Sequence, residues 1–200
     1  GRAADMYAPV WVPAGAEIRL GTPESGLRSY LAVRGGLDVP PVLGSRATDT
    51  MAGLGPAPLV PGSVLPIGQN REPYPAVDFA PQRGYPAELT LRVIPGPRAD
   101  WFTAAALDTL CGNDYLITPD SNRVGVRLSG PPLERRIEGE LPSEATVLGA
   151  LQVPASGQPI LFLADHPVTG GYPVIAVVTE ADIDLAAQGR PGQTVHFRLW

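Results

Sequence analysis

One short polar segment contains most of the side chains that could carry out chemistry: Asp165, His166, Thr169, Gly170, Gly171 and Tyr172. A histidine there can act as a general acid or base near neutral pH, although a histidine without a function fits the pattern equally well. Asp165 can cap the turn through an Asx hydrogen bond or take part in the reaction. The two glycines allow a positive φ angle or the close approach of another group. We predict that Asp165 and His166 are catalytic and that the other four residues bind substrate.

Arginine supplies all of the positive side-chain charge, because the chain contains no lysine. A lysine Schiff base, a lysine general base and the lysine-dependent phosphate loop are therefore excluded. Arg46, Arg123 and Arg127 are the cations that we expect to face an anion, and the last two share a face if both lie on one strand. Guanidinium groups suit carboxylate, carboxybiotin or phosphate, and salt bridges to Asp49 or Asp120 are the structural alternative. We predict that Arg123 and Arg127 are catalytic and that Arg46 binds substrate.

The remaining histidine and the single cysteine favour structural roles. His196 alternates with apolar neighbours near the end of the chain, which predicts a solvent-facing strand residue. Cys111 follows a leucine at an expected helix end and is predicted to be a small buried apolar group. With no paired-cysteine motif we expect no metal site, and a single cysteine predicts a reducing, cytoplasmic location.

The composition is that of a folded chain with a core of its own. Hydrophobic residues make up 44% of the 200 residues and charged residues 18%. No apolar run approaches the ~20 residues of a membrane-spanning helix, so we expect no membrane partner. A net charge of −5 without a basic run argues against nucleic acid as a partner. Because the first residue is Gly1, we expect a processed chain or a fragment of a longer one.

Two apolar runs flank the polar segment, at residues 160–164 and 174–178. Each has the length of one buried strand. Their connection is too short for a helical crossover between parallel strands, so we expect an antiparallel or a sheet-switching arrangement. The polar side chains would then lie at the edge of a rigid sheet, which is a common place for a binding site.

Alternating apolar residues elsewhere predict a mainly β fold. A repeated pattern, a proline followed by a turn glycine and then a strand, begins at Gly15, Gly62 and Gly192, with chance as the alternative. Further elements are expected as strands at 29–34, 88–94, 115–118, 125–128 and 150–153, and as helices at 101–110 and 180–188. Asp100 is the expected cap of the first helix, and a capping box from Thr179 to Asp182 opens the second. The polar, proline-broken stretch 69–86 predicts a first β subdomain at 1–86 and a β-barrel subdomain at 87–200.

Four segments, residues 28–49, 121–131, 149–160 and 164–176, resemble one family in order and spacing; the last reads A-D-H-P-V-T-G-G-Y-P-V-I-A. It is the biotin-dependent carboxyltransferase-like family, which includes the 5-oxoprolinase C component, allophanate hydrolase subunit 2, the regulator KipA and the carboxyltransferase region of urea carboxylase. The resemblance implies a cyclophilin-like antiparallel β-barrel with two short α-helices. It also implies a cyclophilin-like partner subunit, similar to the 5-oxoprolinase B component.

The function that this resemblance favours is that of a subunit of an ATP-dependent 5-oxoprolinase, which opens a lactam to give glutamate. Such a reaction needs an activated amide carbonyl and a stabilised oxyanion, and Gln152 joins the predicted substrate-binding residues for that reason. ATP would be used by the complex, and we expect no cofactor bound by this chain. The alternatives are carboxyl transfer from carboxybiotin on another chain to urea or a similar amide, and a KipA-like regulatory module without enzymatic activity.

The chain also departs from the family pattern. Residues 166–168 replace polar residues of the family loop, and Val174 replaces a lysine. Relatives usually carry an additional N-terminal segment, so we expect this chain to leave strand edges or apolar surface uncovered. We therefore predict a hetero-oligomer with the partner subunit, or a homodimer of the isolated chain.

Overall fold

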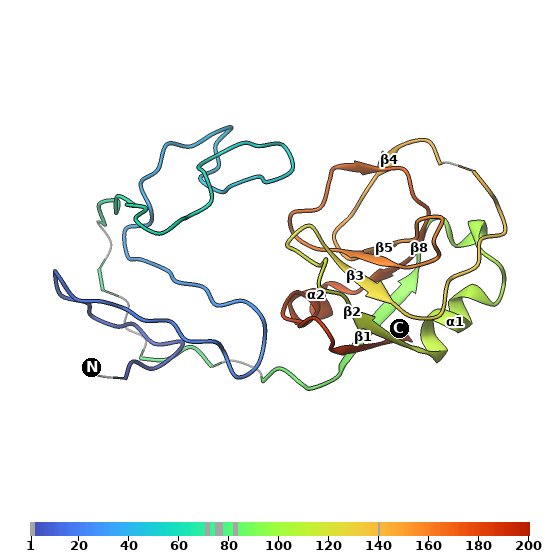
Figure 1. The fold of residues 1–200 in the computed structure, drawn as a ribbon, viewed down its shortest axis with the longest axis horizontal. Helices are drawn as coiled ribbons and strands as arrows, with labels where there is room; N and C mark the ends of the chain where they lie inside the picture. Colours follow the sequence, from blue (N-terminus) through green and yellow to red (C-terminus); the bar gives the residue numbers. More distant parts are fainter. Residues whose placement is uncertain (1–2, 71–72, 75–77, 82–83, 140) are drawn as a thin grey trace. The chain divides into compact units, whose positions relative to one another are not determined.

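The computed structural model describes residues 3–70, 73–74, 78–81, 84–139 and 141–200. The chain forms two compact units, the first made of Gly1–Gly21 and Ser29–Arg83 and the second of Thr22–Arg28 and Gly84–Trp200. All named strands and helices belong to the second unit (Figure 1). This unit also takes up residues 22–28, which the predicted division assigns to the first half. The division into subdomains after residue 86 stays a prediction.

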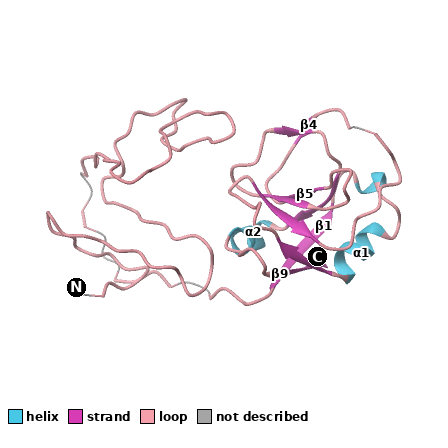
Figure 2. Cartoon of the chain, in the orientation of Figure 1, coloured by secondary structure: helices cyan, strands magenta, loops and turns pink. Residues whose placement is uncertain are grey.

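Seven strands of the second unit close into a barrel, in the order β1-β8-β5-β6-β3-β2-β9. Figure 2 shows the strands in magenta and the helices in cyan. Their bounds are β1 Leu89–Pro95, β2 Asp114–Ile117, β3 Gly125–Ser129, β5 Ala150–Gln152, β6 Ile160–Phe162, β8 Val174–Val178 and β9 Thr194–Leu199. Every neighbouring pair is antiparallel except β1 and β9, which are parallel. The predicted fold, mainly β with an antiparallel β-barrel and two short helices, is confirmed.

The main core fills the barrel because alternate strand residues point inward. Leu91 of β1 and Val195 and Phe197 of β9 are buried there. Tyr115 of β2 packs edge-on against Phe197, with ring centroids 6.0 Å apart. Its hydroxyl donates a hydrogen bond to the Pro131 carbonyl at 2.9 Å, which satisfies the polar end of a buried ring. Burial raises the pKa of Tyr115 to about 12.

The first helix begins later than its sequence pattern predicts. Residues Ala99–Trp101 form a short 3-10 helix, and the α-helix α1 spans Ala106–Gly112. Between them the Thr103 N–H donates to the Glu134 carbonyl at 3.1 Å, so this stretch pairs with another segment and cannot turn as a helix. The prediction of one helix at 101–110 capped by Asp100 is therefore wrong in its first half.

The second helix, α2, spans Glu180–Ala187, close to the predicted 180–188. The expected capping box does not form, because the Thr179 side chain makes no hydrogen bond to the helix backbone. Asp182 instead accepts three hydrogen bonds from Arg92 of β1, from the backbone N–H at 2.8 Å, from Nε at 2.8 Å and from Nη2 at 2.6 Å. This interaction attaches α2 to the barrel, and hydrogen bonding from Arg92 lowers the pKa of Asp182.

The connection between β6 and β8 crosses one strand of the barrel. Both strands run antiparallel to β5, which lies between them, so they are parallel to each other. The predicted antiparallel arrangement is therefore wrong. The alternative of a change of sheet holds for β7, Thr169–Gly170, which pairs with β4, Glu144–Ala145, in a separate two-stranded sheet. No helix is needed, because the crossover passes over a single strand and is supported there by β4.

The three repeated turns share one geometry, which supports the sequence repeat. Gly15, Gly62 and Gly192 have φ angles of 78°, 87° and 84°. In each turn the residue after the glycine donates to the carbonyl three residues earlier, at 2.9 to 3.1 Å. Glycine at the third position with positive φ is typical of a type II turn. Only the third turn leads into a strand, β9, so the strands predicted after Gly15 and Gly62 are wrong.

The first unit lacks both regular strands and a buried core in its described residues. Residues 29–34, predicted as a strand, are irregular, and the pairing consists of isolated bridges such as Leu37 with Ile67. None of the described side chains of this unit is buried. Large apolar groups such as Trp11, Leu43 and Val64 are 81%, 92% and 90% exposed.

Candidate functional site

The candidate site lies where the β6–β8 crossover covers the barrel. Strand β5 is buried on both faces: Leu151 points into the main core, and Ala150 packs with Phe162 and Val174 in a second apolar cluster. A strand that is apolar on both sides needs cover on both sides. The crossover supplies the second cover, since its residue Gly170 lies against a side chain of β5.

That side chain is Gln152, which is only 4% exposed. A Cβ atom on Gly170 would lie 2.5 Å from Gln152 Nε2, a distance that real Cβ atoms essentially never show. The φ angle of Gly170 is not in the left-handed region, so close approach rather than backbone conformation requires glycine here. Within the described residues the Gln152 amide forms no hydrogen bond, so its two N–H donors and its oxygen acceptor are unpaired there.

Two backbone donors follow directly on the crossover. The N–H groups of Gly171 and Tyr172 donate no hydrogen bond to any other described residue. A Cβ atom on Gly171 would meet the Leu141 carbonyl at 3.3 Å, so this part of the crossover is also closely packed. Tyr172 is 47% exposed, which places the two N–H groups near the surface. We call Gln152, Gly170, Gly171 and Tyr172 the crossover site.

An ion pair holds the crossover in place. Arg98, which follows β1, donates from Nε to Glu144 Oε2 at 2.9 Å and from Nη2 to Oε1. Glu144 belongs to β4 and lies opposite Gly170 in the small sheet. The hydrogen bond from Arg98 lowers the pKa of Glu144. The Arg98–Glu144 pair therefore holds β4, which in turn pairs with Gly170 of the site. Nothing in the sequence pattern indicated this ion pair.

Arg135 is a second residue that the sequence pattern did not reveal. Its Nη2 donates to the carbonyl of Val153, the residue after Gln152, and its Nε–H is buried without a partner in the described structure. Burial lowers the pKa of Arg135, and the nearby Tyr172 hydroxyl has a smaller, opposite effect. A signal was present in the sequence, an arginine pair after two prolines, but no periodic pattern marks one member as half-buried.

Three of the predicted catalytic residues lie at the other end of β6. Gln152 is opposite Ile160, the first residue of that strand, whereas Asp165 lies beyond its last residue. Asp165 forms an ion pair with Arg123 at 3.0 Å, and its N–H donates to the Arg123 carbonyl at 3.2 Å. The ring of His166 stacks on Phe162 with centroids 5.7 Å apart.

His166 is further held by its ring nitrogen. Nδ1 lies 3.1 Å from Thr146 Oγ1 and 2.8 Å from the Pro167 carbonyl oxygen. Together with the stacked ring, these contacts fix His166 as part of the crossover. The structure therefore brings Asp165, His166 and Arg123 together, but separates them from the crossover site.

The other predicted residues are dispersed. Arg127 is exposed on β3, but Arg123 precedes that strand, so the two do not share a strand face as predicted. Thr169 is exposed in β7, opposite Ala145.

Arg46 belongs to the first unit. It donates to Asp38 Oδ1 at 3.2 Å and to the Val39 carbonyl at 2.8 Å. The salt bridge considered with Asp49 is not made, because Asp49 accepts hydrogen bonds from the N–H groups of Met51 and Ala52.

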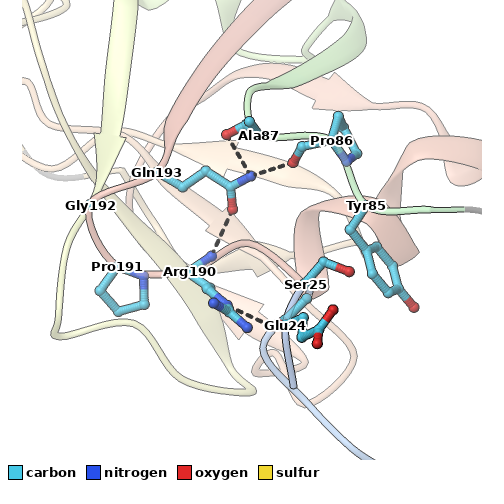
Figure 3. Close-up of a pocket in the computed structure, with 10 residues that line it drawn as sticks. Glu24, Ser25, Tyr85, Pro86, Ala87, Arg190, Pro191, Gly192 and Gln193 are labelled. Atoms are coloured by element: carbon cyan, nitrogen blue, oxygen red, sulfur yellow. Dashed lines mark hydrogen bonds between the residues drawn. The ribbon is translucent and has the colours of Figure 1, made fainter. Parts of the chain in front are cut away.

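A pocket of about 450 Å³ lies elsewhere in the second unit, between residues 24–26, 85–87 and 190–193 (Figure 3). Gln193 donates to the carbonyls of Pro86 and Ala87 at 2.8 and 2.9 Å and accepts from the Arg190 N–H. Arg190 Nε donates to the Gly26 carbonyl at 2.7 Å. These polar groups already hold the neighbouring segments together, so the pocket is explained as part of the fold.

Metal-binding clusters and membrane-spanning helices are both absent from the described residues. There, no three or more histidine, cysteine, aspartate or glutamate side chains are grouped so that they could hold a metal ion. The helices found in the same residues are too short or too polar to cross a bilayer.

Comparisons with known proteins agree with the fold. The C component of 5-oxoprolinase from Escherichia coli (strain K12) is 40% identical over 190 residues, covering 92% of this chain and 60% of that protein. Urea amidolyase of Lachancea kluyveri is 32% identical over 220 residues, covering 96% of this chain and 12% of that protein. The crystal structure of TTHA0988 matches with a TM-score of 0.76 and 41% identity, covering 88% of this chain and 34% of that one. The family model for the carboxyltransferase domain, subdomain A and B, matches residues 1–199, and the chain belongs to that family, as its four sequence segments predicted.

Proposed function

We propose that this chain acts as part of the C component of a 5-oxoprolinase, in the hydrolysis of 5-oxoproline to glutamate. The observation that carries the proposal is the 40% identity to the E. coli protein of that name over nearly the whole chain. The chain spans 60% of that protein's length, so a complete site can require residues outside it.

The crossover site offers the groups that lactam opening requires. Water must add to the amide carbonyl, and the oxygen that becomes negative must be stabilised by preorganised donors. The N–H groups of Gly171 and Tyr172 and the Gln152 amide are unpaired donors of this kind within the described residues. Thr169 and Gly170 would line the same site as predicted substrate-binding residues.

Asp165, His166, Arg123 and Arg127 remain predicted catalytic residues, and Arg46 a predicted substrate-binding residue. The contacts of the first three favour a structural role, because the ion pair and the stacked ring stabilise the crossover. Substituting His166 by glutamine separates the two roles. If His166 is a general base, the substitution should lower kcat steeply. If His166 is structural, the substitution should lower the melting temperature more than kcat.

A partner subunit and ATP complete the proposal. The reaction is driven by ATP, and this chain has no phosphate loop of the lysine-dependent type, so the nucleotide is assigned to the complex. The E. coli relative is named as one of several 5-oxoprolinase subunits, which supports an assembly of more than one chain. A cyclophilin-like chain similar to the 5-oxoprolinase B component is the proposed partner.

The test is ATP-dependent 5-oxoproline hydrolysis by the full-length protein co-purified with its partner subunit. Glutamate release is expected from the complex, with little from either subunit alone. Unchanged activity after removal of this subunit would refute an essential role.

A second candidate is carboxyl transfer from carboxybiotin to urea or a similar amide. The family description and the similarity to urea amidolyase favour it. Biotin must then be attached outside these 200 residues, because attachment needs a lysine and they contain none. Avidin detection of a biotinylated protein that co-purifies with the full-length protein would support this candidate over the first.

A further inference from the structure

Among the described residues, only backbone carbonyl groups position the Arg135 side chain next to the crossover site. Its Nη2 donates to the Val153 carbonyl, and its Nη1 lies 3.5 Å from the Gly139 carbonyl oxygen. The Val153 N–H donates to the Pro173 carbonyl at 3.1 Å, and Pro173 follows Tyr172 of the site. The guanidinium group is therefore hydrogen-bonded to the residue that follows β5, and that residue is in turn bonded to the residue that precedes β8.

The charge of Arg135 is not balanced by a carboxylate in the part of the chain that the structure describes. Three other arginines of the second unit each form an ion pair, namely Arg92 with Asp182, Arg98 with Glu144 and Arg123 with Asp165. Arg135 forms none, and its Nε–H is buried and unpaired among the described residues. Burying a cation without a partner is unfavourable, and burial lowers the pKa of Arg135 accordingly. A bound anion would supply the missing negative charge.

We propose that Arg135 binds the carboxylate of a substrate whose amide carbonyl lies at the crossover site. The inference rests on the proposed function and specifies its substrate class, a lactam or amide that carries a carboxylate. A guanidinium fork matches a carboxylate with two parallel hydrogen bonds, which gives orientation as well as affinity. Arg135 is thus a specificity residue, and an uncharged amide such as urea is expected to bind poorly.

The first test measures binding to the full-length protein in complex with its partner, by calorimetry. The ligands are 5-oxoproline and 2-pyrrolidinone, which is the same lactam without the carboxylate. Arg135→Gln is expected to weaken 5-oxoproline binding about tenfold or more, as for a lost hydrogen bond between charged groups, and to leave 2-pyrrolidinone binding unchanged. Arg136→Gln is the matched control, since Arg136 is exposed and donates to the Asp100 carbonyl. Equal 5-oxoproline affinity in wild type and Arg135→Gln would overturn the inference.

The variant Arg135→Lys tests whether weaker binding is caused by misfolding. Lysine keeps the positive charge and loses only the paired N–H donors of the guanidinium group. The variant should melt close to the wild type and still bind 5-oxoproline more weakly. A purely structural role for Arg135 predicts the reverse, a lower melting temperature with ligand preference intact in the folded fraction.

A second measurement separates this inference from the proposed function. The full-length protein is labelled with ¹⁵N at arginine Nε, and the Arg135 signal is identified by its absence in Arg135→Lys. A saturable shift of that signal with 5-oxoproline, and at higher concentration with acetate, is expected. Hydrolysis without any such shift overturns the inference alone. A shift without hydrolysis overturns the proposed function alone. If neither hydrolysis nor a shift is observed, the inference and the proposed function are both overturned.

Discussion

Replacing Gly170 by alanine is expected to destabilise the barrel, because the new methyl group meets the buried amide of Gln152. The Cβ atom would lie 2.5 Å from Nε2 and 3.1 Å from Oε1. The amide is the far end of a flexible side chain, but Gln152 is only 4% exposed, so either its side chain or the crossover must shift against packed neighbours. Overpacking of this kind costs about 1–3 kcal/mol. For a chain of this length each kcal/mol corresponds to a fall in melting temperature of roughly 2–4 °C.

Urea denaturation followed by fluorescence measures the loss, and two further variants test its cause. Gly112→Ala is the matched control: no heavy atom lies within 4 Å of the added Cβ, and Gly112 ends α1, where alanine is a better helix former. Gln152→Ala removes the amide, so adding Gly170→Ala in that background should cost little. If Gly170→Ala lowers the free energy of unfolding equally with and without Gln152, or not at all, the close contact is not what requires glycine.

Three further predictions concern stability, reactivity and assembly. Asp182→Asn should lower the free energy of unfolding at neutral pH by about 1.5–3 kcal/mol, as for a lost hydrogen bond to a charged group. Because the pKa of Asp182 is depressed in the folded protein, the wild type should lose this stabilisation as pH falls below about 4. Between pH 7 and pH 3 the free energy of unfolding should therefore decrease less in Asp182→Asn than in the wild type, as measured by chemical denaturation. Burial raises the pKa of Cys111, so its thiol should react slowly with a disulfide reagent until the chain is unfolded, and fast labelling of the native protein would contradict this. The exposed apolar side chains of the first unit predict self-association or binding to the partner subunit, and a monodisperse monomer that ignores the partner in light scattering would disprove it.

The strands of the second unit could be predicted from the sequence because they are short apolar runs bounded by glycine and proline. Strand β8 occupies the predicted residues 174–178, and α2 ends one residue from its expected last position. The relative direction of β6 and β8 could not be predicted, because it depends on β5, which enters between them. In the first unit the turn at Gly15 formed as expected, yet no strand follows it. Alternation predicts a strand only where a neighbouring strand completes its hydrogen bonds.

The sequence pattern also could not show which side chains of the candidate site contact each other. Gln152 was recognised through the function that the family resemblance implies, and Gly170 through the glycine pair of the polar segment. Their contact became visible only through the register of β5, β8 and the small β4–β7 sheet. The face assigned to Arg123 and Arg127 was wrong, since Asn122 binds the N–H groups of Val124 and Gly125 and so holds the chain in a turn until the strand begins. Periodicity cannot reveal such a turn.

Whether a cation can bind a ligand depends on what already neutralises it, and this decides between the arginines of the chain. Arg123 looked suited to an anion, but Asp165 occupies its guanidinium group at 3.0 Å. Arg135 carried no signal in the periodicity, and yet its only described partners are neutral carbonyl groups, which accept hydrogen bonds without cancelling the charge. A carboxylate entering beside Val153 would meet a guanidinium group that has no charged partner among the described residues. We therefore assign recognition of an anionic lactam to Arg135, which lies beside the crossover site and has only uncharged partners among the described residues, and not to the arginines with the most suggestive spacing.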